Sequence, residues 1–206
     1  MREKRSRKLP QVLSDDEREA LLKMPNVKSS TGLRNRCLLG LMVNAGLRVS
    51  ELVGKEGVNL EDSDKLGGLQ LDHVNLDTGE LKVINGKGKV DRNLWIDQTD
   101  IDLLKRWIKV RPQVDHSLIF CTLKGEKIYN RYMRAMLERT GKKAGIGRRV
   151  HPHLLRHTCL TDLYKETKDI RLIQKVAGHA DLSTTMIYTH IHDEQVKDAM
   201  KGLRKK

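Results

Sequence analysis

Several side chains that could bind or attack an anionic group fall in the stretch from His151 to His192. His153 and Arg156 are three residues apart, so both would project from one face of a helix. Pro152 suits the first turn of that helix, because the N–H that proline lacks would have no partner there. His153 would then lie at a helix N-terminus, where free N–H groups and the helix dipole favour an anion. The spacing therefore predicts a site for a negatively charged substrate.

A further histidine and a tyrosine follow on the next two predicted helices. Asp169 is a suitable N-cap for the segment DIRLIQKVA, and Gly178 would end that helix directly before His179. A last short helix would then carry Tyr188. We therefore expect a basic pair, a turn histidine and a tyrosine to be delivered to one site by three successive helices.

The histidines also allow a second interpretation, which is a metal site. His153 and His157 are four residues apart, a spacing that can bind zinc on a helix. However, neither an HExxH glutamate nor a CxxC pair accompanies them, and the cysteines are scattered at Cys37, Cys121 and Cys159. The spacing gives a metal site little support, so we expect no metal and no other cofactor.

Two more cationic groups occur earlier in the chain. Arg48 directly follows an apolar helix and a glycine turn, and Glu51 three residues later could orient its guanidinium. The alternative is an ordinary surface ion pair, worth well under ~1 kcal/mol. Lys87 and Lys89 lie in the glycine-rich turn NGKGK, where a lysine can reach a phosphate. The alternative there is a hairpin tip with solvated lysines.

Composition narrows the kind of partner. The 206 residues suit one domain, or one domain with an arm, and the formal net charge of +13 favours a polyanion. Aromatic residues make up only 3% of the chain, which disfavours a base-stacking surface for single strands and favours duplex DNA held by its phosphates. Scattered cysteines, no signal peptide and no long apolar run suggest a cytoplasmic protein without a membrane partner.

The elements that would position these residues can be read along the chain. Residues 1–11 form a basic arm or linker, and a capping box at Ser14 and Glu17 begins a helix through about Met24. We predict further helices over 33–45, 98–110 and 129–144, and short strands over 69–74, 81–84, 92–96 and 118–120. Residues 54–68 are glycine-rich and locally acidic, so we expect a loop that faces away from DNA. The fold class is α+β, mainly helical, with one small three-stranded antiparallel sheet.

Four segments carry a resemblance to a known family. AGLRVSEL (45–52), NGKGKVDR (85–92), HPHLLRHT (151–158) and GHADLSTTMIYTHI (178–191) resemble the motif boxes of the tyrosine recombinases, or phage integrases, and most of all those of Xer-type enzymes. The likeness runs in the right order over residues 12–192. The spacings also match, with 23 residues from Arg156 to His179 and nine from His179 to Tyr188. This joint match outweighs the alternatives for single residues.

The resemblance implies a function and a role for each residue. It makes residues 12–206 the catalytic domain of a site-specific recombinase that cuts duplex DNA through a 3′-phosphotyrosine, without metal or ATP, and rejoins it to another 5′-hydroxyl. Arg48 and Arg156 would clamp the phosphate, while Tyr188 attacks it. The remaining three positions would assist: His153 accepts the tyrosine proton, His179 holds a phosphate oxygen, and Lys87 protonates the leaving oxygen.

The resemblance also implies partners and leaves two alternatives. Family members self-associate on DNA as dimers or tetramers, so we expect the same here, with the protein on the nucleoid. The helix predicted over 193–203 would fold back on its own domain or dock on a neighbouring protomer. A type IB topoisomerase shares the chemistry, and a non-cleaving DNA-binding regulator could share the fold, although all six polar positions are intact.

Two departures from the family pattern qualify the resemblance. Thirty-eight residues separate Arg48 from Lys87, and the acidic 54–68 segment accounts for the excess over a compact Xer-like enzyme. The family's usual N-terminal core-binding domain has almost no counterpart before residue 12. We therefore expect either a fragment or a minimal recombinase, whose partners would include a missing N-terminal domain or accessory proteins.

Overall fold

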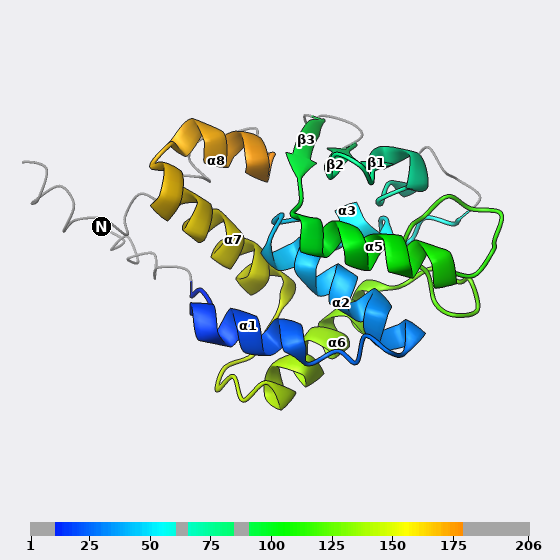
Figure 1. Cartoon of the computed structure of the whole chain (residues 1–206), viewed down its shortest axis with the longest axis horizontal. Coiled ribbons are helices and arrows are strands. Elements are labelled where there is room, and N and C mark those ends of the chain that lie inside the picture. Colours follow the sequence, from blue (N-terminus) through cyan, green and yellow to red (C-terminus); the bar gives the residue numbers. More distant parts are fainter. Residues whose placement is uncertain (1–10, 61–65, 85–90, 179–206) are drawn as a thin grey trace, which may run out of the picture.

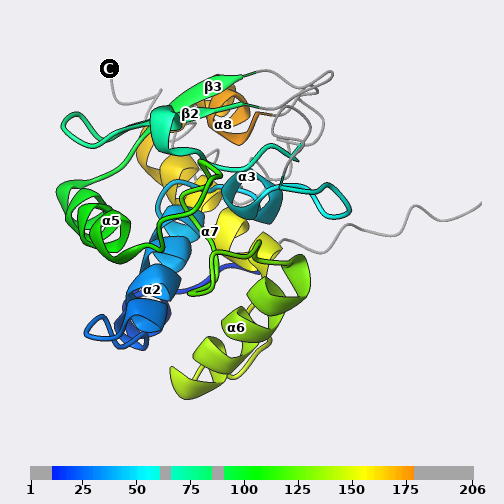
Figure 2. The ribbon, with the colours of Figure 1, turned by 90° about the vertical axis from the view of Figure 1, so that its right-hand side faces the viewer.

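The computed structural model describes residues 11–60, 66–84 and 91–178. Its centre is helix α2 (Ser30–Val43), whose N-cap Ser29 accepts a hydrogen bond from the backbone N–H of Gly32. Nearly the whole second half of α2 is apolar and buried, including Leu38, Leu39 and Met42. The helix packs against α1 (Asp15–Lys23), α5 (Gln98–Val110) and α7 (Pro152–Thr167) (Figures 1 and 2). Because the second half of α2 is apolar all round, it is the helix on which the others assemble.

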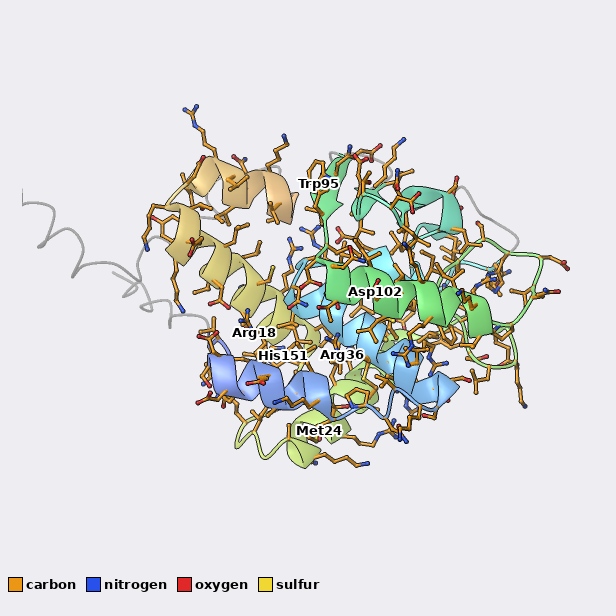
Figure 3. All side chains as sticks on the ribbon, viewed as in Figure 1. Arg18, Met24, Arg36, Trp95, Asp102 and His151 are labelled. Atoms are coloured by element: carbon orange, nitrogen blue, oxygen red, sulfur yellow. The ribbon has the colours of Figure 1, made fainter. Side chains whose placement is uncertain are left out.

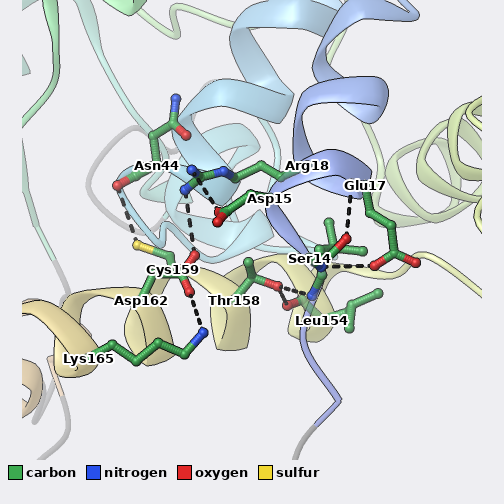
Figure 4. A network of polar contacts seen from close by, with 11 residues as sticks. Ser14, Asp15, Glu17, Arg18, Asn44, Leu154, Thr158, Cys159, Asp162 and Lys165 are labelled. Atoms are coloured by element: carbon green, nitrogen blue, oxygen red, sulfur yellow. Dashed lines mark hydrogen bonds and ion pairs between the residues drawn. The ribbon is translucent and has the colours of Figure 1, made fainter.

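Contacts between α1 and α7 connect the beginning of the described chain with a helix near its end. The capping box predicted at Ser14 and Glu17 is confirmed, with both reciprocal hydrogen bonds present. Just before it, the backbone N–H of Leu13 donates to the buried hydroxyl of Thr158 at 2.9 Å (Figure 4). Arg18 of α1 also contacts Asp162 of α7 at 3.5 Å. These contacts fix α1 against α7.

The remaining helices follow the predicted pattern, with shifts at their ends. Helix α5 spans the predicted 98–110 and is capped by Asp97, and α6 (Asn130–Lys143) differs from the predicted 129–144 by one residue at each end. Helix α2 begins three residues before the predicted residue 33, because Ser29 supplies the cap. A short helix, α3 (Val49–Val53), follows the Gly46 turn.

The predicted three-stranded antiparallel sheet is confirmed, in the order β1-β2-β3. Strands β2 (Glu80–Val83) and β3 (Arg92–Trp95) pair with Leu81 opposite Leu94 and Val83 opposite Arg92. The inward positions alternate with period two, so Arg92 shares the buried face of β3 with Leu94.

The first predicted strand, over 69–74, is wrong for most of its length. Strand β1 is only Val74–Asn75, and residues 71–73 form a 3-10 turn, η1 (Leu71–His73). The backbone around residue 70 pairs with the segment around residue 118 instead. The N–H of Leu71 donates to the carbonyl oxygen of Ser117 at 2.9 Å, and the N–H of Ile119 donates to the carbonyl oxygen of Leu69 at 2.9 Å. The strand predicted over 118–120 is likewise reduced to an isolated bridge between residues 70 and 118. These two short segments pair with each other, which local sequence pattern does not reveal.

The three cysteines are buried, and none of them forms a disulfide. Within the described ranges, none of the helices is long and apolar enough to cross a membrane.

Candidate active site

The N-terminus of α7 has the predicted arrangement. His151 is the N-cap, and its Nδ1 accepts the backbone N–H of Leu154 at 3.2 Å. Pro152 takes the first helical position, which places His153 in the first turn with an exposed side chain. Burial, and then the charges of His153 and Arg149, lower the pKa of His151. An uncharged His151 agrees with its role as an acceptor at this cap.

Arg156 lies one turn further along α7 and is buried, with 6% of the residue exposed. Its Nη1 donates to the carbonyl oxygen of Gly46, and its Nη2 donates to the carbonyl oxygen of Ala177. Gly46 has a φ of +66°, which favours glycine, and an added Cβ would lie 3.2 Å from the sulfur of Cys159. One guanidinium therefore connects the turn before Arg48 with the end of helix α8 (Ile170–Ala177).

Arg48 is held by the carboxylate that its sequence spacing suggested. It is the N-cap of α3, where its backbone N–H donates to Glu51 Oε2 at 2.8 Å and its Nη1 donates to Oε1 at 2.7 Å. The Glu51 side chain is only 4% exposed, whereas 24% of the Arg48 side chain is exposed. The contact is thus a buried positioning interaction and not the surface ion pair that was the alternative.

A second arginine shares the same carboxylate. Arg92 Nη1 donates to Glu51 Oε1 at 3.0 Å, and Arg92 Nη2 donates to Oε2 at 2.9 Å. Burial raises the pKa of Glu51, but the hydrogen bonds and charges of Arg92 and then Arg48 outweigh it and hold the pKa at about 2. Glu51 is therefore a carboxylate at any physiological pH, with two guanidiniums against it.

These elements enclose a pocket of about 490 Å³ that brings together three of the six predicted site residues, Arg48, His153 and Arg156. Asn130 and Arg134 of α6 and Arg149 of the preceding loop also line it. The lining contains four arginines and two histidines and no carboxylate: Arg48, Val49, Ser50, Asn130, Arg134, Arg149, Val150, His151, Pro152, His153 and Arg156. Together with the N-terminus of α7, this composition suits a phosphate group.

The other three predicted residues, Lys87, His179 and Tyr188, lie outside the described residues. The structure does place their described neighbours. The hairpin that contains Lys87 is bounded by the paired residues Val83 and Arg92. Helix α8 is capped by Asp169 and ends at Gly178 in the left-handed conformation, as predicted, immediately before His179.

Sequence reasoning missed several residues of the pocket. Asn130 and Arg134 are four residues apart on α6, so a helical projection of that basic helix could have placed them on one face. Arg149 directly precedes the segment HPHLLRHT, and His151 lies within the same motif as His153. Arg92, which lies outside the pocket lining, carried a clearer signal, since it alternates with Leu94 on the inward side of its strand.

The beginning of the acidic segment contacts a residue that lines the site. Asn130, which lines the pocket, donates to Glu56 Oε2 at 3.2 Å. Lys127 holds this part of the loop by donating from Nζ to the carbonyl oxygens of Lys55 and Val58. The expectation that 54–68 lies off the DNA-binding side stays a prediction, and residues 61–65 of this segment lie outside the described residues.

A metal site and a second pocket are the alternatives to this site for chemistry on DNA. Among the described residues, no group of three or more histidine, cysteine or acidic side chains has the arrangement of a metal site. A larger pocket of about 940 Å³ lies between α1, α7, α8 and β3, but it contains none of the predicted site residues. Its lining includes Asp15, Asp16, Glu19, Asp162 and Glu166, which would repel a phosphate.

Comparison with known proteins shows the family to which the chain belongs. The model of the phage integrase family matches residues 11–195. Over 199 residues, the chain is 35% identical to tyrosine recombinase XerD of Staphylococcus saprophyticus and 34% identical to XerD of Staphylococcus aureus. Each alignment covers 94% of this chain and 62% of the relative, so the chain spans about 62% of the length of these relatives.

Solved structures show the same architecture. A crystal structure of XerA recombinase has a TM-score of 0.77 at 28% identity, covering 96% of this chain and 66% of that one. XerH recombinase bound to its difH substrate before cleavage has a TM-score of 0.76 at 29% identity, covering 97% and 56%. The catalytic domain of bacteriophage HP1 integrase, at 19% identity and a TM-score of 0.59, shares the fold. By its family match, its relatives and its fold, the chain belongs to the phage integrase family.

Proposed function

We propose that residues 12–206 are the catalytic domain of an Xer-like tyrosine recombinase, which cuts and rejoins duplex DNA through a covalent 3′-phosphotyrosine. The observation that carries the proposal is the pocket in which Arg48, Arg156 and the α7 N-terminus converge with no carboxylate in the lining. The family match and the XerD relatives support the same activity.

The arrangement suits attack on a phosphodiester. As the nucleophile approaches in line, negative charge gathers on the non-bridging oxygens, and fixed guanidiniums can stabilise it without a metal ion. Arginine suits this role because it stays protonated at any working pH. Arg156 is fixed by two backbone carbonyls and Arg48 by Glu51, so both cations are in place before the substrate binds.

The remaining steps are assigned to residues by their motif positions. Tyr188 attacks the phosphorus and displaces the 5′-oxygen, which leaves as a hydroxyl after Lys87 donates a proton to it. His153 accepts the tyrosine proton, and His179 donates a hydrogen bond to a phosphate oxygen. Tyrosine has an ordinary pKa near ~10, so it needs such an acceptor or a strongly positive site. The energy of the broken bond is kept in the phosphotyrosine, so rejoining needs no ATP.

The proposed substrate is double-stranded DNA. A net charge of +13 and a pocket rich in arginine suit a polyanion, and a solved structure of the relative XerH holds the difH substrate. We also propose that the protein acts in the cytoplasm and self-associates on DNA. The XerD relatives extend beyond the matched region. We therefore propose that a further DNA-binding domain, in the same polypeptide or in a partner protein, completes the contact with the duplex.

A covalent trap with a mixture of DNA sequences tests the proposed function. A library of nicked duplexes with a randomised central segment is incubated with the protein, and SDS-stable protein–DNA adducts are recovered and sequenced. The proposal predicts adducts through a 3′-phosphate on an enriched sequence. Binding without any adduct would indicate a non-cleaving regulator. Relaxation of supercoiled plasmid by the chain alone, without strand exchange between duplexes, would indicate a type IB topoisomerase.

A further inference from the structure

The Arg92 side chain is almost completely buried, 2% exposed, and its guanidinium contacts two other parts of the fold. Arg92 itself begins β3, at the end of the hairpin that contains Lys87. Its two terminal nitrogens bond the two oxygens of Glu51, at 3.0 and 2.9 Å. Its Nε donates to the carbonyl oxygen of Val176 at 2.7 Å. The proposed reaction does not use Arg92, so its burial calls for another explanation.

The contact with Glu51 connects Arg92 to Arg48. Each Glu51 oxygen accepts one hydrogen bond from Arg92 and one from Arg48, so the carboxylate is shared between the two residues. Because Arg92 occupies one edge of the carboxylate, Arg48 contacts it through a single terminal nitrogen and remains partly exposed. Without Arg92, both oxygens would be available to the Arg48 guanidinium, which would turn from the pocket toward Glu51.

The contact with Val176 connects Arg92 to the end of α8. The last carbonyl groups of a helix carry partial negative charge and favour a cation. Arg92 takes the carbonyl of Val176 and Arg156 takes that of Ala177, so two buried arginines hold adjacent carbonyls. The packing at this end is close, since a Cβ added to Gly178 would lie 3.0 Å from Arg92 Nη1. His179 follows at the next position.

We propose that Arg92 is a positioning residue that holds three elements in register: the Arg48 helix through Glu51, the end of α8 before His179 through Val176, and its own strand β3, which follows Lys87 in the sequence. The inference rests on the proposed recombinase function. Arginine is required because three donors, pointing in different directions from one rigid plane, are used at once. A lysine offers its donors from a single nitrogen and cannot span Glu51 and Val176 in this way.

The test compares Arg92→Met and Arg92→Lys with Arg36→Met and Arg36→Lys. Arg36 is a matched control, because it lies on α2 (Figure 3), lines the larger pocket and not the candidate site, and pairs with buried Asp100 at 3.2 Å. Single-turnover cleavage and Kd are measured on a nicked duplex recovered by the covalent trap, at a temperature where every variant is folded. Amide hydrogen exchange is measured over residues 46–53 and 174–178 in the absence of DNA.

Arg92→Met should slow cleavage by about 100-fold, the scale of a misplacement near 1 Å, while Kd changes little. Arg92→Lys should recover part of the rate. Exchange over both segments should accelerate in the Arg92 variants, more in Arg92→Met than in Arg92→Lys. Both Arg36 variants should exchange there like wild type and cleave nearly as fast. If Arg92→Met does not fold, the cleavage rates and the amide hydrogen exchange of Arg92→Lys and Arg36→Lys test the inference in the same way.

Three results would overturn the inference: unchanged cleavage in the Arg92 variants, an equal loss in the Arg36 variants, or a loss of DNA affinity that accounts for the slower cleavage. Failure of the proposed function looks different. In that case wild type forms no adduct at all, and hydrogen exchange still reports whether Arg92 holds the segments together. Unchanged exchange in Arg92→Met would overturn the positioning role whatever wild type does to DNA.

Discussion

Arg156 on α7 donates a hydrogen bond to the carbonyl oxygen of Gly46, a residue 110 positions earlier in the chain. Only Leu47 separates Gly46 from Arg48, so the second arginine of the pocket fixes the turn that presents the first. Arg156 therefore helps to position Arg48, the other cation that would face the phosphate. This contact explains how motifs that are far apart in the sequence form one site.

Arg156→Lys should therefore lose more than a charge contact. Lysine cannot hold the carbonyls of Gly46 and Ala177 and also face a phosphate. We expect cleavage to fall by about 100-fold or more, together with a loss of stability of about 1–3 kcal/mol from the unpaired carbonyls. Denaturant unfolding and single-turnover cleavage measure the two effects. Wild-type cleavage in Arg156→Lys would contradict this account of the residue.

Glu51 should make stability depend on pH in a defined window. Its pKa is about 2 in the folded protein and near the ordinary 4.5 when unfolded, so the folded form favours the carboxylate. The stabilisation is therefore complete above pH 4.5 and is lost as the pH falls toward 2. Its size is on the order of 3 kcal/mol, from the difference between the two pKa values.

The Glu51 prediction is checked by urea unfolding at about pH 7, 4 and 3, in wild type and two variants. Glu51→Gln should be less stable at neutral pH, because it leaves buried Arg92 without its counter-charge, and should lose less stability on acidification. Glu138→Gln, which removes a carboxylate from the surface, is the control and should keep most of the wild-type pH dependence. An identical pH profile for Glu51→Gln and wild type would refute the assignment.

The sequence was enough to predict the helices and the order of the site motifs. Caps such as Ser14 and Asp169, the proline of the HPH motif and the glycine that begins the GHA motif act through local hydrogen bonds and backbone angles, so they can be read directly. The resemblance then supplied the roles of residues that spacing alone left open.

The structural features that could not be predicted from the sequence depend on contacts between distant segments of the chain. Residues 69–71 alternate like a strand, but their partners lie near residue 118, so the predicted strand became a bridge and a 3-10 turn. The alternation of Arg92 with Leu94 points to an inward position, but its partners Glu51 and Val176 are distant in sequence and cannot be read from that pattern. The contact between Glu56 and Asn130 likewise joins a loop to a helix 74 positions away.

Lys87 and its neighbour Lys89 should behave differently in cleavage. As the proton donor, Lys87 is needed when the leaving group is a 5′-oxygen, so Lys87→Ala should cleave normal DNA poorly. A substrate with sulfur at the 5′-bridging position needs little protonation to leave and should restore most of the rate. Lys89→Ala is the matched control and should show neither the defect nor the rescue. The assignment fails if the two variants respond alike.

DNA binding by this chain should be dominated by phosphate contacts. We expect weak affinity with little sequence preference and a steep fall with salt, with a slope of about −0.9 in log K against log salt for each phosphate neutralised. Arg134→Ala should reduce the magnitude of that slope by about 1, because Arg134 lines the pocket. Arg106→Ala is the control, since its side chain bonds the carbonyl of Val27 away from the pocket.

A titration of cognate-like and random duplexes over a salt series checks this prediction. Tight, selective binding that hardly weakens with salt would show that the chain already makes a complete specific interface. Supplying a DNA-binding domain in trans, or fusing one before Lys8, should raise both affinity and selectivity if the catalytic domain normally acts with such a part.

The most direct test of the central claim is whether Tyr188→Phe still forms a covalent adduct with DNA. This substitution removes only the attacking oxygen, so the variant should bind the trapped nicked duplex with wild-type affinity and form no SDS-stable adduct. Tyr164→Phe, a tyrosine of α7 outside the pocket lining, is the control and should form the adduct as wild type does. An SDS-stable adduct from Tyr188→Phe at the wild-type rate would contradict the account, because the DNA would then be joined to another residue.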